Sequence, residues 1–268
     1  MADTTSNIYR DPKDLLDELG VIKPDDIDIE AIAEFCGATV LYQPLEGAEA
    51  RIIGHGDRAI ISVNDASPRG RQRFSVGHEL GHWAWDRGKI AFSCDDRKFS
   101  GEWTGRDKES VANMYASDLL LPAHMFKPVA NKKAATFETV RALADSFQTS
   151  LTATSIRLVQ HGSFPSMVIC SNAAGRKWFV RSRELEEVNL WPRRDLSQDS
   201  LAFGLLRGTK SATGPEDVDA DTWIDHRDAG EYVIKEDSVK ITPDLVLTLL
   251  WWKDEAQLQG MVDDSDDE

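Results

Sequence analysis

The sequence predicts an α+β protein with two domains, and three observations support this. Residues 15–164 alternate helix-period and strand-period segments, whereas residues 165–254 are rich in β-branched and aromatic residues separated by turn signals. The chain has 268 residues, of which 41% are hydrophobic, so it can bury two cores. We expect a lead at 1–14, a first domain at 15–164, a C-terminal domain of unassigned function at 165–254 and a disordered acidic tail at 255–268.

The first domain opens with segments typical of a helix beside a small sheet. Asp28 is a suitable N-cap for a helix that ends at Gly37. Residues 39–42, 50–53 and 59–63 have the composition of strands, and a Gly-rich turn joins the last two. We therefore predict a small antiparallel sheet that offers an edge strand, within 59–63, to an extended peptide.

Helices follow the small sheet, and strands dominate beyond Pro165. We predict four helices, at 71–87, 107–121, 137–147 and 151–160. The last two have helix-turn-helix spacing and form a predicted pair within 136–161. In the C-terminal domain we expect extended segments at 167–170, 177–181, 231–241 and 245–252.

Charge and composition exclude several classes of protein. The net charge is −15 and the sequence pI is about 4.8, so we expect no direct binding to nucleic acid, which needs a clustered positive surface. No apolar stretch is long enough to span a membrane, and no signal peptide is visible, so we expect a cytoplasmic protein. The three cysteines are widely spaced and are interpreted as reduced thiols. Of the three, Cys94 is the candidate for sensing oxidants.

The strongest chemical signal is the segment His78-Glu79-Leu80-Gly81-His82. It places two imidazoles four residues apart on one helical face, which suits a zinc ion with nitrogen ligands. Glu79 lies beside this face rather than on it. It is therefore the candidate general base, taking a proton from water that the cation has made more acidic.

A catalytic zinc site needs a third protein ligand, and Glu109 is the candidate. It shares a helical stripe with Ala112 and Ala116, so its carboxylate projects from a face that should be buried. A divalent cation would remove the cost of burying that charge, and the alanines would let the two helices approach closely. Four other acidic residues are weaker rivals for this position, namely Asp95, Asp96, Glu102 and Asp107.

Two glycines and two tryptophans lie in or beside this motif. Gly77 and Gly81 are unfavourable inside a helix, which indicates either close packing or the approach of substrate. The sequence does not separate these two explanations. Trp83 and Trp85 are both expected to pack in the core.

A longer pattern resembles the ImmA/IrrE family of metallo-endopeptidases. The residues that carry it are the run from Arg73 to Trp83, the run Glu109-Ser-Val-Ala-Asn-Met-Tyr-Ala-Ser-Asp-Leu-Leu-Leu-Pro122, the upstream helix and strands, and the helix from Ser150 to Leu158. The resemblance covers about residues 15–163. Gly77 stands where such sequences often have alanine.

The resemblance implies a zinc-peptidase-like core of helices on a small sheet. It implies His78, His82 and Glu109 as metal ligands for Zn²⁺, with Mn²⁺ as the alternative, and Glu79 as general base. Members of the family cleave helix-turn-helix transcriptional repressors, relieving repression of stress, mobile-element or prophage genes. Such a repressor is the expected protein substrate. A second oxyanion donor is usual in these sites, and Tyr115 and His124, the latter placed in a loop, are the candidates.

Two other functions remain open at the level of sequence. The predicted helix pair could belong to a DNA-binding regulator, but the second helix carries only Arg157 as a cation. Alternatively, the protein could sequester a partner without proteolysis. The acidic ends are interpreted as solvated segments.

Overall fold

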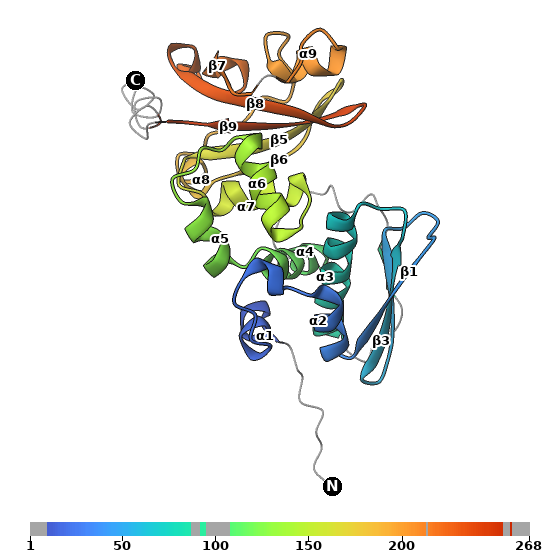
Figure 1. The fold of residues 1–268 in the computed structure, drawn as a ribbon. Helices are drawn as coiled ribbons and strands as arrows, with labels where there is room; N and C mark the ends of the chain where they lie inside the picture. The colour runs from blue at the N-terminus through green and yellow to red at the C-terminus, as the bar shows by residue number, and fades with distance from the viewer. Residues whose placement is uncertain (1–9, 87–91, 95–107, 213, 254–257, 259–268) are drawn as a thin grey trace. The chain divides into compact units, whose positions relative to one another are not determined.

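The computed structural model describes residues 10–86, 92–94, 108–212, 214–253 and 258 (Figure 1). The chain forms two compact units by its internal contacts, one of residues 1–126 and 144–150 and the other of residues 127–143 and 151–268. The predicted α+β class is confirmed, with a small sheet and helical core followed by a second sheet. The predicted domain boundaries remain a prediction.

The first unit contains a four-stranded mixed sheet. Its strands are β1 (Ala38–Gln43), β2 (Ala50–His55), β3 (Arg58–Asn64) and β4 (Phe92–Cys94), in the order β1-β3-β2-β4. Strand β2 is antiparallel to β3 and β4, but β1 runs parallel to β3. The expectation of a purely antiparallel sheet is therefore wrong for one pair, because the β2–β3 hairpin joins β1 through its second strand.

This strand order also corrects the predicted peptide-binding edge. Residues 59–63 lie in β3, whose backbone pairs with β1 on one side and β2 on the other. A strand with two partners has no free hydrogen-bonding edge to offer. In the described sheet, the outer strands are β1 and β4.

One face of this sheet is covered by helices. Along β3, Ala59, Ile61 and Val63 are buried, whereas Ile60 is 48% exposed, as the alternation of strand side chains requires. Helices α2 (Ile29–Phe35) and α3 (Arg69–Asp86) lie on the buried face, and α4 (Lys108–Leu120) packs against α3 (Figure 1). Helix α3 therefore packs against the sheet on one side and against α4 on another.

Several helix ends follow local sequence rules. The Asp28 side chain accepts a hydrogen bond from Ala31 N at 3.0 Å, and the chain turns at Gly37, whose φ is 80°. Four α-helices were not predicted: α1 (Pro12–Glu18), α5 (Ala123–Ala130) and two short helices at 183–187 and 201–207. Helices α1 and α5 both have proline at or just before the first turn, a position that proline tolerates well. That signal could have identified them.

The predicted helix pair is present as α6 (Phe137–Phe147) and α7 (Leu151–His161). A turn of three residues, Gln148 to Ser150, joins them, and Gln148 adopts a positive φ of 53°. This short connection gives the pair its helix-turn-helix spacing.

The second unit contains a five-stranded antiparallel sheet in the order β6-β5-β9-β8-β7. Its strands are β5 (Ser166–Asn172), β6 (Gly175–Arg181), β7 (Glu216–Asp219), β8 (Val233–Thr242) and β9 (Leu245–Trp251). Two short helices, α8 (Arg183–Glu187) and α9 (Leu201–Arg207), accompany it. Their apolar residues, such as Leu185 and Leu201, join strand residues in one core that includes Trp252.

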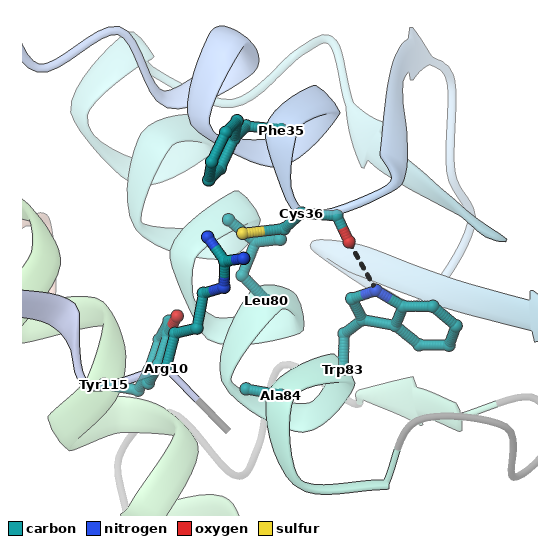
Figure 2. Close-up of a pocket in the computed structure, with 7 residues that line it drawn as sticks. All are labelled: Arg10, Phe35, Cys36, Leu80, Trp83, Ala84 and Tyr115. Carbon is teal, nitrogen blue, oxygen red and sulfur yellow. Dashed lines mark hydrogen bonds between the residues drawn. The ribbon is translucent and has the colours of Figure 1, made fainter. Parts of the chain in front are cut away.

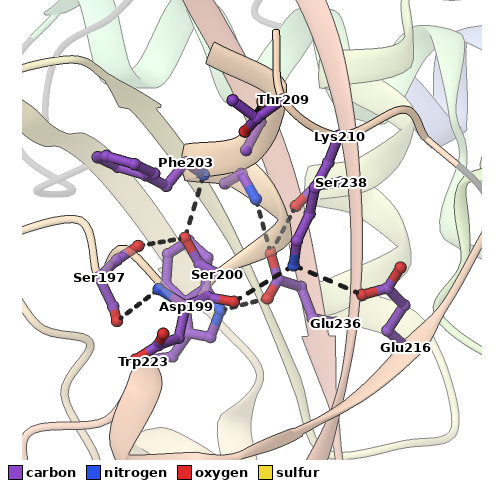
Figure 3. A network of polar contacts seen from close by, with 12 residues as sticks. Ser197, Asp199, Ser200, Phe203, Thr209, Lys210, Glu216, Trp223, Glu236 and Ser238 are labelled. Carbon is purple, nitrogen blue, oxygen red and sulfur yellow. Dashed lines mark hydrogen bonds and ion pairs between the residues drawn. The ribbon is translucent and has the colours of Figure 1, made fainter. Parts of the chain in front are cut away.

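Two adjacent carboxylates of β8 are buried, and each receives hydrogen bonds at the start of a helix. Glu236 accepts from Ala202 N at 3.0 Å, Trp223 Nε1 at 2.9 Å and Ser238 Oγ at 3.0 Å (Figure 3). Asp237 accepts from Phe137 N at 2.7 Å, at the first residue of α6. Burial raises the pKa of both carboxyls, although these donors oppose the rise.

Among the described residues, no helix has both the length and the apolar character that a membrane crossing requires.

We predict an acid-sensitive contribution to stability from Glu30. Burial would raise the pKa of this carboxyl, but hydrogen bonds from Arg69 and Tyr42 outweigh it and lower the pKa to about 2. A lowered folded-state pKa means that the stabilisation is full above the unfolded-state value of about 4.3 and is lost as the pH falls toward 2. The unfolding free energies of wild type and Glu30→Gln should therefore differ at pH 7 and converge near pH 2.

Urea titrations across this range measure the difference. Glu34→Gln is the matched control, since Glu34 lies on the same helix but its pair with Arg58 is long, at 3.8 Å, and exposed. An unchanging difference between wild type and Glu30→Gln from pH 7 to pH 2 would contradict the prediction.

Candidate metal centre

The site depends on the close approach of α3 and α4. A Cβ atom added at Gly81 would lie 2.9 Å from Ala112 Cα, and one added at Gly77 would lie 3.2 Å from Ala116 Cα. The two glycines of α3 therefore face the two alanines of α4. Close packing is thus the reason for both glycines, which settles the alternative that the sequence left open.

Three predicted ligands come together at this helix contact. His78 Nε2 lies 3.4 Å from Glu109 Oε2, and His82 Nε2 lies 3.6 Å from Glu109 Oε1. The two Nε2 atoms are 3.1 Å apart. The set of three ligand atoms, one from each residue, lies within 4.8 Å of one another.

These separations fit a tetrahedral divalent cation. Two atoms that each lie about 2.05 Å from a cation and subtend a tetrahedral angle are about 3.3 Å apart. The two Nε2 atoms are 3.1 Å apart, and each lies near this value from one of the two Glu109 oxygens, His78 Nε2 at 3.4 Å from Oε2 and His82 Nε2 at 3.6 Å from Oε1. The donor set of two imidazoles and one carboxylate, with a fourth position left over, is that of catalytic zinc sites.

The site is enclosed on the histidine side and more open on the glutamate side. His78 and His82 are 1% and 3% exposed, whereas the Glu109 side chain is 28% exposed. The histidines are fixed by the core of the first unit. Of the three candidate ligands, Glu109 is therefore the most accessible to solvent.

Glu79 is fully buried, at 0% exposure, on the same helix as the two histidines. It follows His78 directly, so it projects about 100° around the helix from that ligand. A carboxylate placed beside the ligand face can take part in proton transfer without occupying a ligand position.

Asn113 is a site residue that the sequence analysis missed. Its Oδ1 lies 2.9 Å from His78 Nδ1, and its side chain is buried at 8% exposure. It stands one turn after Glu109 on α4, which places both side chains on the same helical face. That i,i+4 spacing of a polar residue was the signal that could have found it.

The structure places Tyr115 in a small pocket on another side of α3 (Figure 2). It is 4% exposed, and it lines this pocket together with Leu80, Ala84 and Arg10. None of the three ligands lines the pocket. An oxyanion role for Tyr115 therefore remains a prediction that this placement does not favour.

His124 was expected in a loop, but it lies exposed on α5. The pKa of Asp17 is lowered mainly by the hydrogen bond from Lys13 and to a smaller extent by the charge of His124. The charge of His124 thus acts on Asp17 of α1. Its oxyanion role also remains a prediction.

The rival ligands Asp95, Asp96, Glu102 and Asp107 lie outside the described residues, as does the side chain of Cys94.

The two tryptophans of α3 differ. Trp83 is 5% exposed; its Nε1 donates to Cys36 O at 3.0 Å (Figure 2), and its ring fills the space above Gly54. Trp85 is 56% exposed, so the expectation that it packs in the core is wrong. Residues two apart on a helix point to nearly opposite sides, so only one of the pair can face the sheet.

Comparisons with known proteins agree with this geometry. The profile of the IrrE N-terminal-like domain family, Peptidase_M78, matches residues 33–159, which include all three candidate ligands. A Mycobacterium tuberculosis transcriptional regulator of known structure is similar in fold, with a TM-score of 0.58 at 13% identity, over 96% of this chain and 78% of that chain. No curated protein sequence matches the chain.

We predict that Gly81→Ala weakens both the fold and the metal site. The new methyl group would meet the Ala112 backbone at 2.9 Å, so α3 and α4 must separate and carry His82 away from Glu109. Overpacking of this kind costs about 1–3 kcal/mol. Thermal unfolding and zinc titration measure the two effects.

Gly77→Ala is the matched control, because its methyl group would meet Ala116 at the longer distance of 3.2 Å. It should shift both readouts less than Gly81→Ala does. A wild-type zinc affinity in Gly81→Ala would show that the helix contact is not what positions the ligands.

Proposed function

We propose, from the membership of residues 33–159 in the IrrE N-terminal-like domain family (Peptidase_M78), that the chain is a metal-dependent endopeptidase. The observation that carries the proposal is the convergence of His78, His82 and Glu109 beside the buried carboxylate of Glu79. A histidine pair with an adjacent carboxylate and a third, remote carboxylate is the donor set of a hydrolytic zinc site.

The residues divide the chemistry between them. His78, His82 and Glu109 would hold the cation, which when bound supplies Lewis-acid chemistry by activating water and polarising a carbonyl. Zinc is the proposed metal because the donors are two nitrogens and one carboxylate, and Mn²⁺ is the alternative.

Glu79 moves the proton. Its carboxylate accepts a proton from the attacking water and then delivers it to the nitrogen of the leaving amine, so that the residue ends in its starting state. Glu79 is buried, so bulk water does not surround its carboxylate. The proton is therefore not lost to solvent between the two steps.

The proposed substrate is a helix-turn-helix transcriptional repressor, whose cleavage would control stress or mobile-element genes. The sequence resemblance to repressor-cleaving endopeptidases supports it. The fold likeness to a protein named a transcriptional regulator is consistent with it, although that likeness concerns the fold alone.

A DNA-binding function is less well supported. In helix α7, the candidate recognition helix, the residues from Thr154 to Val159 are buried, including Arg157 at 4% exposure. A recognition helix has to expose basic or amide side chains to the groove.

We predict that Glu79→Gln abolishes cleavage while preserving the metal site. The amide keeps the size of the side chain but cannot accept the proton, so the rate should fall by about 10²–10⁴. Intact-mass analysis of a repressor encoded beside the gene, incubated with protein and Zn²⁺ or Mn²⁺, gives the products and the cleavage site. Zinc bound per chain should match wild type.

Glu46→Gln, a change at an exposed glutamate in the same unit, is the control and should cut like wild type. Cleavage by Glu79→Gln at the wild-type rate would overturn the proposed role of this residue. Loss of biological activity should accompany loss of cleavage; retention of activity would favour a partner-sequestering protein.

We predict that Glu109→Gln lowers metal affinity rather than acting on the chemical step alone. The amide removes the negative charge that the cation needs from its third ligand, so zinc should dissociate at far lower chelator concentrations. A chromophoric chelator competition measures the change. An affinity equal to that of wild type would exclude Glu109 as a ligand.

A further inference from the structure

We propose that Asn113 is a positioning residue that fixes the tautomer of His78, so that its Nε2 presents a lone pair to the metal. The inference rests on the proposed metal site. It concerns a side chain that is not itself a ligand and lies on the opposite side of the imidazole from the other two ligands.

The contact determines where the imidazole proton lies. The Asn113 carboxamide oxygen, 2.9 Å from His78 Nδ1, can only accept a hydrogen bond, so Nδ1 must carry the proton. A neutral imidazole has one N–H, and Nε2 is then unprotonated. Nε2 is the atom that faces both His82 and Glu109.

The positions of the other two candidate ligands agree with this assignment. His82 Nε2 lies 3.1 Å and Glu109 Oε2 lies 3.4 Å from His78 Nε2. An unprotonated His78 Nε2 therefore directs its lone pair toward the other candidate ligand atoms.

Burial makes the alternative tautomer costly. His78 is 1% exposed and Asn113 is 8% exposed, so water does not readily replace the acceptor at Nδ1. A proton placed on Nε2 would leave the amide oxygen facing a lone pair and would block the metal position. Outer hydrogen bonds of this kind typically change metal affinity by about 10–100-fold.

Helix α4 supplies both functions from successive turns. Glu109 provides a ligand, and Asn113, four residues later, orients another ligand on the facing helix. Ala112, which lies between them in the sequence, packs against Gly81 and so brings the α4 backbone close to α3. The α4 helix thus sets both the third ligand and the geometry of the first.

The test compares Asn113→Leu, which removes the acceptor, with Asn113→Asp, which keeps one. Ser117→Ala is the control, because Ser117 is a buried polar residue one turn further along α4. Two readouts are measured on the full chain: zinc affinity by chelator competition, and the ¹⁵N shifts of the His78 ring in metal-free protein, which report the tautomer directly.

We expect Asn113→Leu to bind zinc about 10–100-fold more weakly and to lose the pure Nδ1–H tautomer of His78. Asn113→Asp and Ser117→Ala should retain both properties. A wild-type affinity and an unchanged tautomer in Asn113→Leu would overturn the inference. So would equal losses in the leucine and aspartate variants, because that result would indicate a purely structural role.

The tautomer readout needs no metal. A wild-type protein that binds no zinc would overturn the proposed function, whereas the ring shifts of His78 would still decide whether Asn113 sets its tautomer. Circular dichroism of each variant separates loss of the fold from loss of the hydrogen bond.

Discussion

The backbones of α3 and α4 approach closely where Gly77 and Gly81 face Ala116 and Ala112, and the candidate metal centre depends on this contact. Glycines of α3 face alanines of α4 at distances where a Cβ atom would touch backbone. Because the two histidines lie on one helix and the glutamate lies on the other, the helix separation sets the distances between the ligand atoms. The helix interior thus accepts two unfavourable glycines, at a cost of up to about 1 kcal/mol each, to assemble a site from separate segments.

Buried charge is handled differently in the two units. In the second unit, Glu236 and Asp237 are neighbours on one strand, so their side chains point to opposite faces, and each accepts backbone hydrogen bonds at the start of a different helix. These hydrogen bonds offset part of the free-energy cost of removing each carboxylate from water. Burial nevertheless raises the pKa of both carboxyls. In the first unit, Glu30 is paired with a cation and its pKa falls instead. Two differences account for this: the Glu30 side chain is 34% exposed whereas Glu236 and Asp237 are buried, and Glu30 accepts a hydrogen bond directly from the charged Arg69.

Local signals predicted much of the fold and missed the parts that depend on pairing partners. The helix capped by Asp28, the helix pair at α6 and α7 and most strands of the two sheets follow from capping residues, periodicity and β-branched composition, whereas the short strands β4 and β7 were not predicted. The parallel pairing of β1 with β3 does not, because a strand's own composition carries no information about which neighbour it joins. The same limit explains Trp85. Its large apolar side chain is typical of a core residue, but the helix face on which it lies is exposed.

By itself, the sequence determined which three side chains come together at the candidate metal site. The spacing of His78 and His82 fixes two imidazoles on one face, and the alanine stripe of α4 places Glu109 on a face that has to be buried, because both are properties of a single helix. Only the tertiary structure decided that Gly77 and Gly81 serve helix packing, that Asn113 contacts His78, and that Tyr115 and His124 lie toward other elements. These are contacts between segments far apart in the chain, and the physical reason is that helix periodicity gives the direction of a side chain but not the neighbour it meets.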